Sequence, residues 1–376
     1  MRYLTLFFAL AIFSFAQISE LKEQSFKLKS DKAKIDNDVL KNSWINQLKI
    51  QANLDRSKNQ NREDISISLN QDIFRSGGIF YAIEYAKIKS IYNLNTIEKE
   101  KIQMLYSVYR FSLELKKIDF EIEKQKILIK NSKIDIKMKE ERYENGLLDI
   151  ADLDEAIINL NNLENALQSL KEQKAINLQN IKNISDINYL DIEVNQLNIP
   201  NLEQFLEKNF ISLQKNVIDI KSKLLDMQKS DFLPKLTVNS SYGYDNDKSD
   251  DSYNFILSLS MPIDFDYKKK IESKKLDYLI EKLNLKDMKN QEIRAFETFK
   301  YKIYSIDKKI ENTKNIIARY VNLKNRIAEL FKSGLKTEDD LTIISNTKKT
   351  KELDLKTFRL ERENLILELL SRGDFR

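Results

Sequence analysis

The chain has 376 residues with no cysteine and no histidine, which excludes disulfide bonds, a thiolate nucleophile, an imidazole base and the commonest metal ligands. Its 63 basic and 58 acidic residues leave a net charge of only +5, and their interleaving is typical of solvated helix faces, not of a nucleic-acid surface. Paired carboxylates could still hydrolyse glycosides, but a sequence with so few loops offers little pocket. We therefore expect no enzyme, no cofactor, no metal site and no nucleic-acid partner.

Residues 1–16 have the features of a secretory signal peptide. Arg2 is followed by a short apolar stretch at 4–13, and Ser14-Phe15-Ala16 fits the small-x-small cleavage rule, so the mature chain is expected to begin at Gln17. An uncleaved anchor is the alternative, although the stretch is too short to span a bilayer as a helix. The later sequence has no run of about 20 apolar residues. We expect an exported protein without a transmembrane helix and, lacking cysteine, without a lipid-modified cysteine.

The first β signal is a pair of alternating segments. Apolar and polar residues alternate strictly over 48–54 and again over 65–70, with a polar stretch at about 56–62 between them. This pattern predicts two amphipathic strands at about 44–55 and 63–73, joined by a turn. Their polar faces carry Gln47, Lys49, Gln51 and Asn53, and then Ser66, Ser68 and Asn70.

A long helix is predicted next, because no proline or glycine occurs from Ile79 to Glu144. These 66 residues would form a helix about 100 Å long. Two apolar rows with a seven-residue period run along it, one from Val108 to Tyr143 and one from Leu113 to Ile134. Two rows on different sides predict neighbouring helices on both sides, with a superhelical twist. A return helix near Asp149 completes a hairpin at about 79–185.

The second half repeats this order. Alternating segments predict strands at about 235–245 and 252–263, and a heptad pattern that only Glu292 and Thr313 interrupt predicts a helical hairpin at about 266–370. The fold class is therefore mainly α with a small β part, in two structural repeats at 17–190 and 200–376. The sequence does not indicate the conformation of residues 186–202.

The chain has only 6 glycines and 3 prolines, so the positions of helix breakers are informative. One pattern occurs twice, 188 positions apart (146 to 334): an aromatic residue, a glycine three positions later, and an Asp-Leu pair six positions after the glycine. The first copy contains Tyr143, Gly146, Asp149 and Asp152, and the second contains Phe331, Gly334, Thr337 and Asp340. This repeat predicts two helical hairpins with tight tips, each glycine ending a helix at positive φ.

The strands have two possible environments. They could form two water-soluble hairpins that cover a helical core. However, strands of this length with one apolar face, one polar face and aromatics near their ends are typical of a membrane barrel. The aromatics are Trp44, Tyr242, Tyr244, Tyr253 and Phe255. Four strands cannot close a barrel alone, so several chains would have to pool them.

At this point the sequence resembles the TolC-like outer-membrane efflux proteins. The resemblance is carried by Ile67–Phe74 with Ser76-Gly77-Gly78, by Phe232-Leu233-Pro234-Lys235-Leu236, by Ser258–Ile263, and by the tip segments 143–153 and 331–341, which occur in the family's order along the chain. Two features depart from the family's pattern. Ser43-Trp44 stands where a Leu-Pro is expected before the first strand, and Phe265-Asp266-Tyr267 stands where glycines are expected after the last.

The resemblance implies a homotrimer with a shared transmembrane β-barrel in the outer membrane and a long periplasmic α-barrel tunnel. Such a protein is the passive exit duct of a tripartite efflux or type I secretion system, with a periplasmic adaptor and an inner-membrane transporter of the RND, ABC or MFS type. The alternative is an exported periplasmic coiled-coil protein, either structural or an adaptor. The sequence does not indicate whether drugs, metals or proteins are exported.

The resemblance also implies roles for the tips. Tyr143, Gly146, Asp149, Phe331, Gly334 and Thr337 would dock the adaptor, and Asp152 and Asp340 would face the periplasmic aperture. In a trimer three such carboxylates would converge and bind cations. A purely local role is the alternative, since acidic residues in a first helical turn complement the helix dipole, and for Asp149 and Glu338 this interpretation is preferred.

Overall fold

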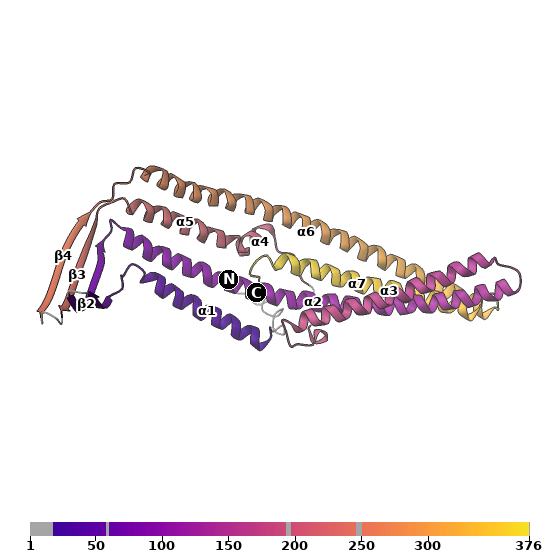
Figure 1. Ribbon diagram of the computed structural model, residues 1–376. Helices are drawn as coiled ribbons and strands as arrows, with labels where there is room; N and C mark the ends of the chain where they lie inside the picture. Colours follow the sequence, from indigo (N-terminus) through magenta and orange to yellow (C-terminus); the bar gives the residue numbers. More distant parts are fainter. Residues whose placement is uncertain (1–17, 58–59, 193–196, 246–249, 376) are drawn as a thin grey trace. The chain divides into compact units, whose positions relative to one another are not determined.

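The computed structural model describes residues 18–57, 60–192, 197–245 and 250–375 (Figure 1), and the signal peptide expected at 1–16 lies outside them. The chain forms two compact units, and each unit combines segments from both sequence repeats. The tip unit comprises Met1–Gln24, Glu100–Asn209 and Glu292–Arg376, and the sheet unit comprises Ser25–Lys99 and Phe210–Gln291. The two repeats themselves remain a prediction from the sequence.

The sheet unit contains one antiparallel sheet of four strands in the order β1-β2-β3-β4. The strands are β1 (Lys49–Ser57), β2 (Gln60–Phe74), β3 (Lys235–Asp245) and β4 (Asp250–Ser260). All four predicted strands are therefore confirmed. The central pairing of β2 with β3 joins the two halves of the sequence, and β1 and β4 are left as the edges.

The strand bounds differ from prediction at places where the backbone pairing does not follow the alternation of apolar and polar residues. The polar stretch predicted as a turn at 56–62 is mostly paired, and Arg56 lies opposite Asn61. Backbone pairing does not require an alternating sequence pattern, so the strands extend beyond the residues that alternate. β1 starts at Lys49 rather than at 44. Before it, the Gln71 side chain accepts a hydrogen bond from Asn46 N (2.7 Å) and donates to Trp44 O (3.0 Å), replacing ladder bonds.

The last strand ends earlier than predicted, at Ser260 rather than at 263. Pro262 lies two residues beyond and has no backbone N–H to donate, so the ladder with β3 stops before it. At the other end β4 begins at Asp250, opposite Asp245 of β3.

The four long helices are confirmed with close bounds. They are α2 (Gly78–Glu144), α3 (Ile150–Lys182), α6 (Tyr267–Lys332) and α7 (Glu338–Leu370). Sequence reasoning did not identify the shorter helices α1 (Glu20–Lys41), α4 (Leu202–Lys208) and α5 (Leu213–Ser230), or the 3₁₀ turns η1 (Tyr189–Asp191) and η2 (Phe210–Ser212). Of the residues described, none belongs to a helix with the length and apolar character needed to cross a membrane.

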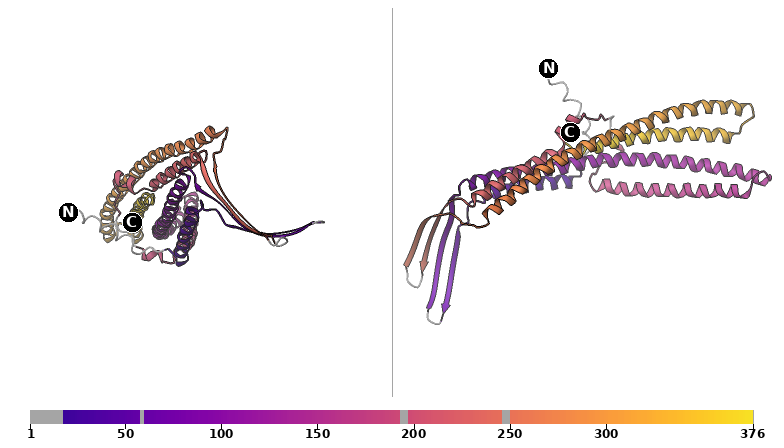
Figure 2. Two further views of the ribbon diagram at one scale, coloured as in Figure 1. Left: turned by 90° about the vertical axis from the view of Figure 1, so that its left-hand side faces the viewer. Right: turned by 90° about the horizontal axis from the view of Figure 1, so that it is seen from above.

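Within the tip unit α2 has neighbours on two sides, as its two apolar rows predict (Figure 2). On one side α3 contacts it through Lys174, whose Nζ lies 2.5 Å from Asp119 Oδ1, and through Gln125, which donates to Leu163 O at 2.9 Å. On the other side lies α7. A helix packed between two others needs both of its apolar rows, and this is the reason for the long uninterrupted pattern.

The α2–α7 contact is an ion-pair ladder with heptad spacing. Basic residues of α2 seven positions apart meet acidic residues of α7 seven positions apart, in antiparallel order. The pairs are Arg110 with Glu368 (3.6 Å), Lys117 with Glu361 (3.5 Å) and Lys124 with Asp354 (2.6 Å). Burial by itself lowers the pKa of Lys117, but the carboxylates around it, Glu114 first, together raise that pKa above its ordinary value.

A compact aromatic core lies where α4, α6 and α7 meet in the tip unit. Its buried members are Phe205, Phe296, Phe299 and Leu369. Beside it Glu292, which interrupts the heptad pattern of α6, accepts hydrogen bonds from Arg372 (2.7 Å) and Asn209 (3.0 Å). The interruption in the pattern is therefore an anchoring point for the C-terminal segment.

Candidate functional site

The first tip is a helix end closed by hydrogen bonds. Gly146 has φ of +69°, and its N–H donates to Tyr143 O at 2.9 Å. The next N–H, of Leu147, reaches back to Arg142 O at 2.8 Å. This pair of bonds is a Schellman motif, which needs a left-handed residue at the glycine position. The predicted positive φ at Gly146 is confirmed.

The second tip repeats the first bond for bond. Gly334 has φ of +74° and donates to Phe331 O at 3.0 Å, while Leu335 N donates to Leu330 O at 2.9 Å. The duplication seen in the sequence therefore extends to the backbone geometry. At neither glycine does any heavy atom lie within 4 Å of the position that a Cβ would take, so the requirement is one of backbone conformation alone.

The helices that start after the tips are capped in two different ways. Asp149 accepts a hydrogen bond from Ala151 N (3.1 Å) at the start of α3. At the start of α7, Thr337 Oγ1 accepts from Asp340 N (3.1 Å), and Asp340 Oδ2 accepts from Thr337 N (3.1 Å), which together make a reciprocal capping box. Asp149 was expected to complement the helix dipole from the first turn, and the structure places it one residue earlier, as the N-cap of α3.

The two aspartates predicted at the aperture have different surroundings. Asp340 lies in the capping box with Lys336 Nζ 3.5 Å away, and the hydrogen bond from the Thr337 N–H, above all, holds its pKa below the usual range. Asp152 is exposed in the first turn of α3, and its carbonyl oxygen accepts from Lys139 Nζ at 3.3 Å. Their convergence on an aperture remains a prediction.

Apolar side chains are displayed at both tips. Leu147 is 77% exposed and Leu335 is 72% exposed, and Tyr143 and Phe331 are also exposed. We call these four residues the tip patch. The two leucines were not identified from the sequence, although an apolar residue directly after the glycine is a common companion of a Schellman motif. Lys137 of α2 and Asp339 of α7 form an ion pair at 3.8 Å near the two tips.

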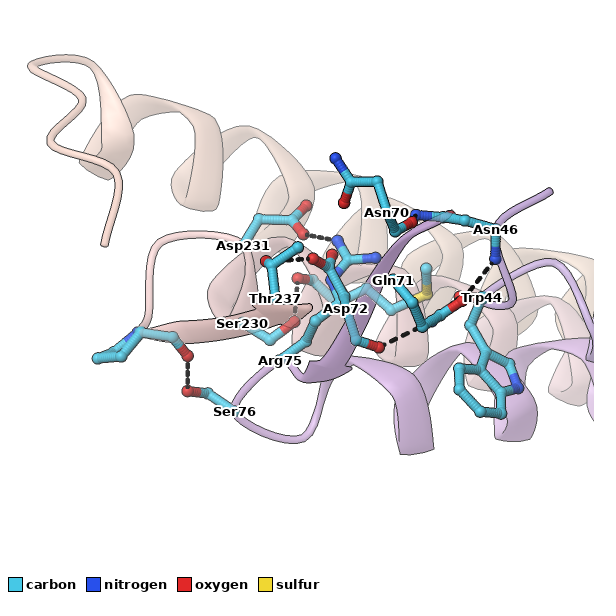
Figure 3. Close-up of polar contacts among 12 residues, drawn as sticks. Trp44, Asn46, Asn70, Gln71, Asp72, Arg75, Ser76, Ser230, Asp231 and Thr237 are labelled. Carbon is cyan, nitrogen blue, oxygen red and sulfur yellow. Dashed lines mark hydrogen bonds and ion pairs between the residues drawn. The ribbon is translucent and has the colours of Figure 1, made fainter. Parts of the chain in front are cut away.

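In the sheet unit a polar network ties the ends of β2 and β3 to the helices that follow or precede them (Figure 3). Arg75 pairs with Asp231 at 2.7 Å, Thr237 donates to Asp72 at 2.7 Å, and Ser76 donates to Pro234 O at 2.6 Å. Each bond links positions more than 150 residues apart in sequence, so no local pattern could have revealed it.

The strand register sorts the sheet into two faces. Polar rows run across all four strands, as in Lys49, Ser68, Ser241 and Asn254. The alternate rows are largely apolar, as in Ile50, Ile67, Tyr242 and Tyr253. The face assignments made from the sequence are confirmed. Across the described residues no cluster of acidic side chains is arranged to hold a metal ion.

No protein-family model and no curated protein sequence matches this chain. Solved structures do. The outer-membrane channel CmeC of Campylobacter jejuni superposes with a TM-score of 0.75 at 14% identity, over 97% of this chain and 85% of its own. The outer-membrane protein VceC of Vibrio cholerae gives 0.72 at 13% identity, over 95% and 94%. The channel-forming protein CusC gives 0.73 at 12% identity, over 97% and 92%. The chain has the TolC-like fold.

The TolC-like fold spans almost the entire chain, so the resemblance found in four short motifs extends to the complete arrangement of strands and helices. Of the three, CmeC is described as an outer-membrane channel and CusC as forming a transmembrane channel. At such low identity the match establishes the architecture of this chain and leaves its activity to be argued from its own residues.

Proposed function

We propose that this protein is the outer-membrane channel of an efflux or type I secretion system and acts as a homotrimer. The observation that carries the proposal is the sheet, which has one apolar face, one polar face and two open edges, at β1 and β4. In a bilayer an unpaired strand edge costs several kcal/mol for each unsatisfied group. Three copies that pair β4 of one with β1 of the next remove all edges, giving a shared barrel with a polar lumen.

The tips support the second part of the proposal, which concerns partners. A passive duct needs energy from elsewhere, and we infer that the tip patch docks a periplasmic adaptor linked to an inner-membrane transporter of the RND, ABC or MFS type. Exposed apolar residues at a rigid, hydrogen-bonded turn are suited to such docking. The alternative, a periplasmic coiled-coil scaffold or adaptor, would have no need of a four-stranded sheet with two contrasting faces.

Assembly is tested by comparing two neighbouring positions on β4. Leu257 pairs with Val238 on the apolar face, and Ser258 pairs with Thr237 on the polar face. Leu257→Arg should place a charge in lipid, at a cost of roughly 2–4 kcal/mol near the midplane, and abolish membrane assembly. Ser258→Arg should leave the trimer intact and alter conductance. Equal effects on assembly, or a stable monomer by light scattering, would contradict the proposal.

The aperture is tested by electrical recording. If three copies of Asp340 and of Asp152 converge, multivalent cations should block the channel, and Asp340→Ala or Asp152→Ala should weaken that block. The trimer itself should still form, because both residues lie in the tip unit. Unchanged block in both variants would mean that the two aspartates serve only their own helices.

A further inference from the structure

The apolar row of β4 does not stop where the strand stops. From Tyr253 onward every second residue is apolar and exposed, and this alternation continues past Ser260 into the segment that leads to α6. The row consists of Tyr253, Phe255, Leu257, Leu259, Met261 and Ile263. The next two apolar residues at this spacing, Phe265 and Tyr267, lie in the turn before α6 and at its first residue. Ile263 is 87% exposed and Phe265 is 97% exposed, so the residues beyond the strand are among the barest apolar side chains of the sheet unit.

The row begins with aromatic residues and continues with aliphatic ones. Phe255 and Ile263 are eight positions apart, which is about 26 Å in extended chain and about 20 Å after a strand tilt of about 40°. Phe265 follows in the turn that leads into α6. An apolar band of about 25 Å between two aromatic girdles is the outer surface of a membrane barrel. The apolar part of β4 alone, from Tyr253 to Leu259, covers only about 15 Å on the same reckoning.

The two acidic residues of the segment form hydrogen bonds and ion pairs with groups close to them in sequence. Asp264 accepts hydrogen bonds from Asp266 N (2.7 Å) and from Lys270 Nζ (2.5 Å), and Asp266 accepts from Lys269 Nζ (3.0 Å). Both carboxylates are thus neutralised locally, which lowers the cost of holding them at a membrane surface. Tyr267, the first residue of α6, packs edge-on against Phe232 at 6.0 Å between ring centroids, and this contact fixes the start of the helix.

We propose that Met261–Tyr267 is a membrane anchor that inserts Ile263 and Phe265 into the boundary between lipid headgroups and acyl chains, on the side of the bilayer where the helices begin. This inference rests on the proposed function, because it requires the sheet to span a membrane. It also gives a reason for the aromatic residues of Phe265-Asp266-Tyr267, at a place where the resemblance led us to expect glycines. Here the aromatic side chains would contact the membrane interface, whereas glycines would only allow the chain to bend.

The native chain has no cysteine, so single-cysteine variants can be labelled with a fluorophore without further changes. We would label Phe265→Cys, Leu257→Cys and Ser258→Cys in full-length protein reconstituted into phosphatidylethanolamine–phosphatidylglycerol vesicles. Nitroxide lipids with the quencher at the headgroup or deep in the acyl chain then report depth. Fluorescence loss at position 265 should be greater with the headgroup quencher, loss at 257 greater with the deep one, and loss at 258 small with both.

The outcomes separate the two proposals. Deep quenching at 257 without any quenching at 265 would overturn the anchor while leaving the channel in place. No quenching at either position would overturn both. If a label at 265 were shielded and cross-linked to a neighbouring subunit, a second copy of the chain and not lipid would be its partner, and the anchor would again be wrong.

A second pair of variants measures the anchor's contribution to assembly. Phe265→Ser should reduce the amount of trimer recovered from vesicles, and Phe265→Trp should restore it, since tryptophan is favoured at the interface. Both variants should fold equally well in detergent, because the side chain is almost fully exposed in the chain itself. Equal recovery of the serine and tryptophan variants from vesicles would contradict the proposal.

Discussion

The two hairpin tips share one backbone turn but differ in how the next helix begins. Gly146 and Gly334 adopt nearly the same φ and close the same pair of hydrogen bonds. After them, however, Asp149 caps α3 alone, whereas Thr337 and Asp340 cap α7 together. The conformation of the turn is required twice, but the aspartate of the Asp-Leu pair takes part in capping only in the second tip, where it is Asp340 and not Asp152.

The chemistry of the cap residue accounts for this difference. The Thr337 hydroxyl both accepts from Asp340 N and donates to Asp340 Oδ2 (3.2 Å). Asp149 occupies the equivalent position of the first tip, and an ionised carboxylate only accepts. A second carboxylate from Asp152 would meet a like charge there. A motif repeated in the sequence thus keeps the same turn geometry at both tips, while Asp152 is left free of the capping role that Asp340 has.

The largest expected effect tests what the tips share. Gly146→Val and Gly334→Val should each destabilise their tip by about 1–3 kcal/mol, because a β-branched residue is strained at positive φ. Hydrogen exchange of the Leu147 and Leu335 amides measures this opening directly. Asparagine tolerates the left-handed region, so Gly334→Asn is the matched control and should cost much less. Valine variants that exchange as slowly as the native protein would contradict the Schellman assignment.

The next effect tests what the tips do not share. Asp340→Ala should weaken the start of α7 by about 1 kcal/mol, the usual cost of losing a helix cap. Asp152→Ala should change the start of α3 by much less. Amide exchange in the first turn of each helix compares the two variants in the same way. Thr337→Ser, which keeps the hydroxyl, should behave like the native protein, and equal losses for both alanine variants would remove the distinction between the tips.

A smaller effect should appear on acidification. The pKa of Asp340 is lowered below 3.8 in the folded chain, chiefly by the Thr337 N–H. When the pKa of a carboxyl group is lower in the folded state than in the unfolded state, its stabilisation is fully present above the unfolded-state pKa. That stabilisation is lost as the pH falls through the folded-state pKa. Protection of the first turn of α7 should therefore decrease below about pH 3.8. Asp340→Asn should lack this step, and if it retains the step another carboxylate is responsible.

The smallest effect on stability should come from the tip patch. Leu147→Ser and Leu335→Ser should each change the unfolding free energy by less than about 0.5 kcal/mol, because the side chains are mostly exposed. Thermal unfolding measures this. If the patch docks an adaptor as proposed, the same variants should form normal trimers and lose export. Normal export with both leucines replaced would place the docking surface elsewhere.

Sequence by itself determined the features that breakers and a sustained period encode, but not the shorter helices α1, α4 and α5. The bounds of the long helices, the positive φ of both tip glycines, the strands and the faces of their residues all follow from breakers, caps and periodicity. These signals are local, because backbone conformation responds to nearby side chains. Asp149 and Thr337 could have been recognised as helix caps from their types and positions.

Tertiary structure alone decided the features that join distant segments. The pairing of β2 with β3, the Arg75–Asp231 ion pair and the meeting of Lys124 with Asp354 each link residues more than 150 positions apart. A basic residue every seven positions is typical of a solvated helix face, and only the structure places the matching acidic residues of α7 opposite this row of α2. Likewise, the alternation in β4 predicted an apolar row, but only the structure shows that the strand ends at Ser260 and that Phe265 beyond it is exposed. The energy of a strand pair or an ion pair depends on which distant segment lies opposite. The topology of the chain, not its local sequence pattern, decides this.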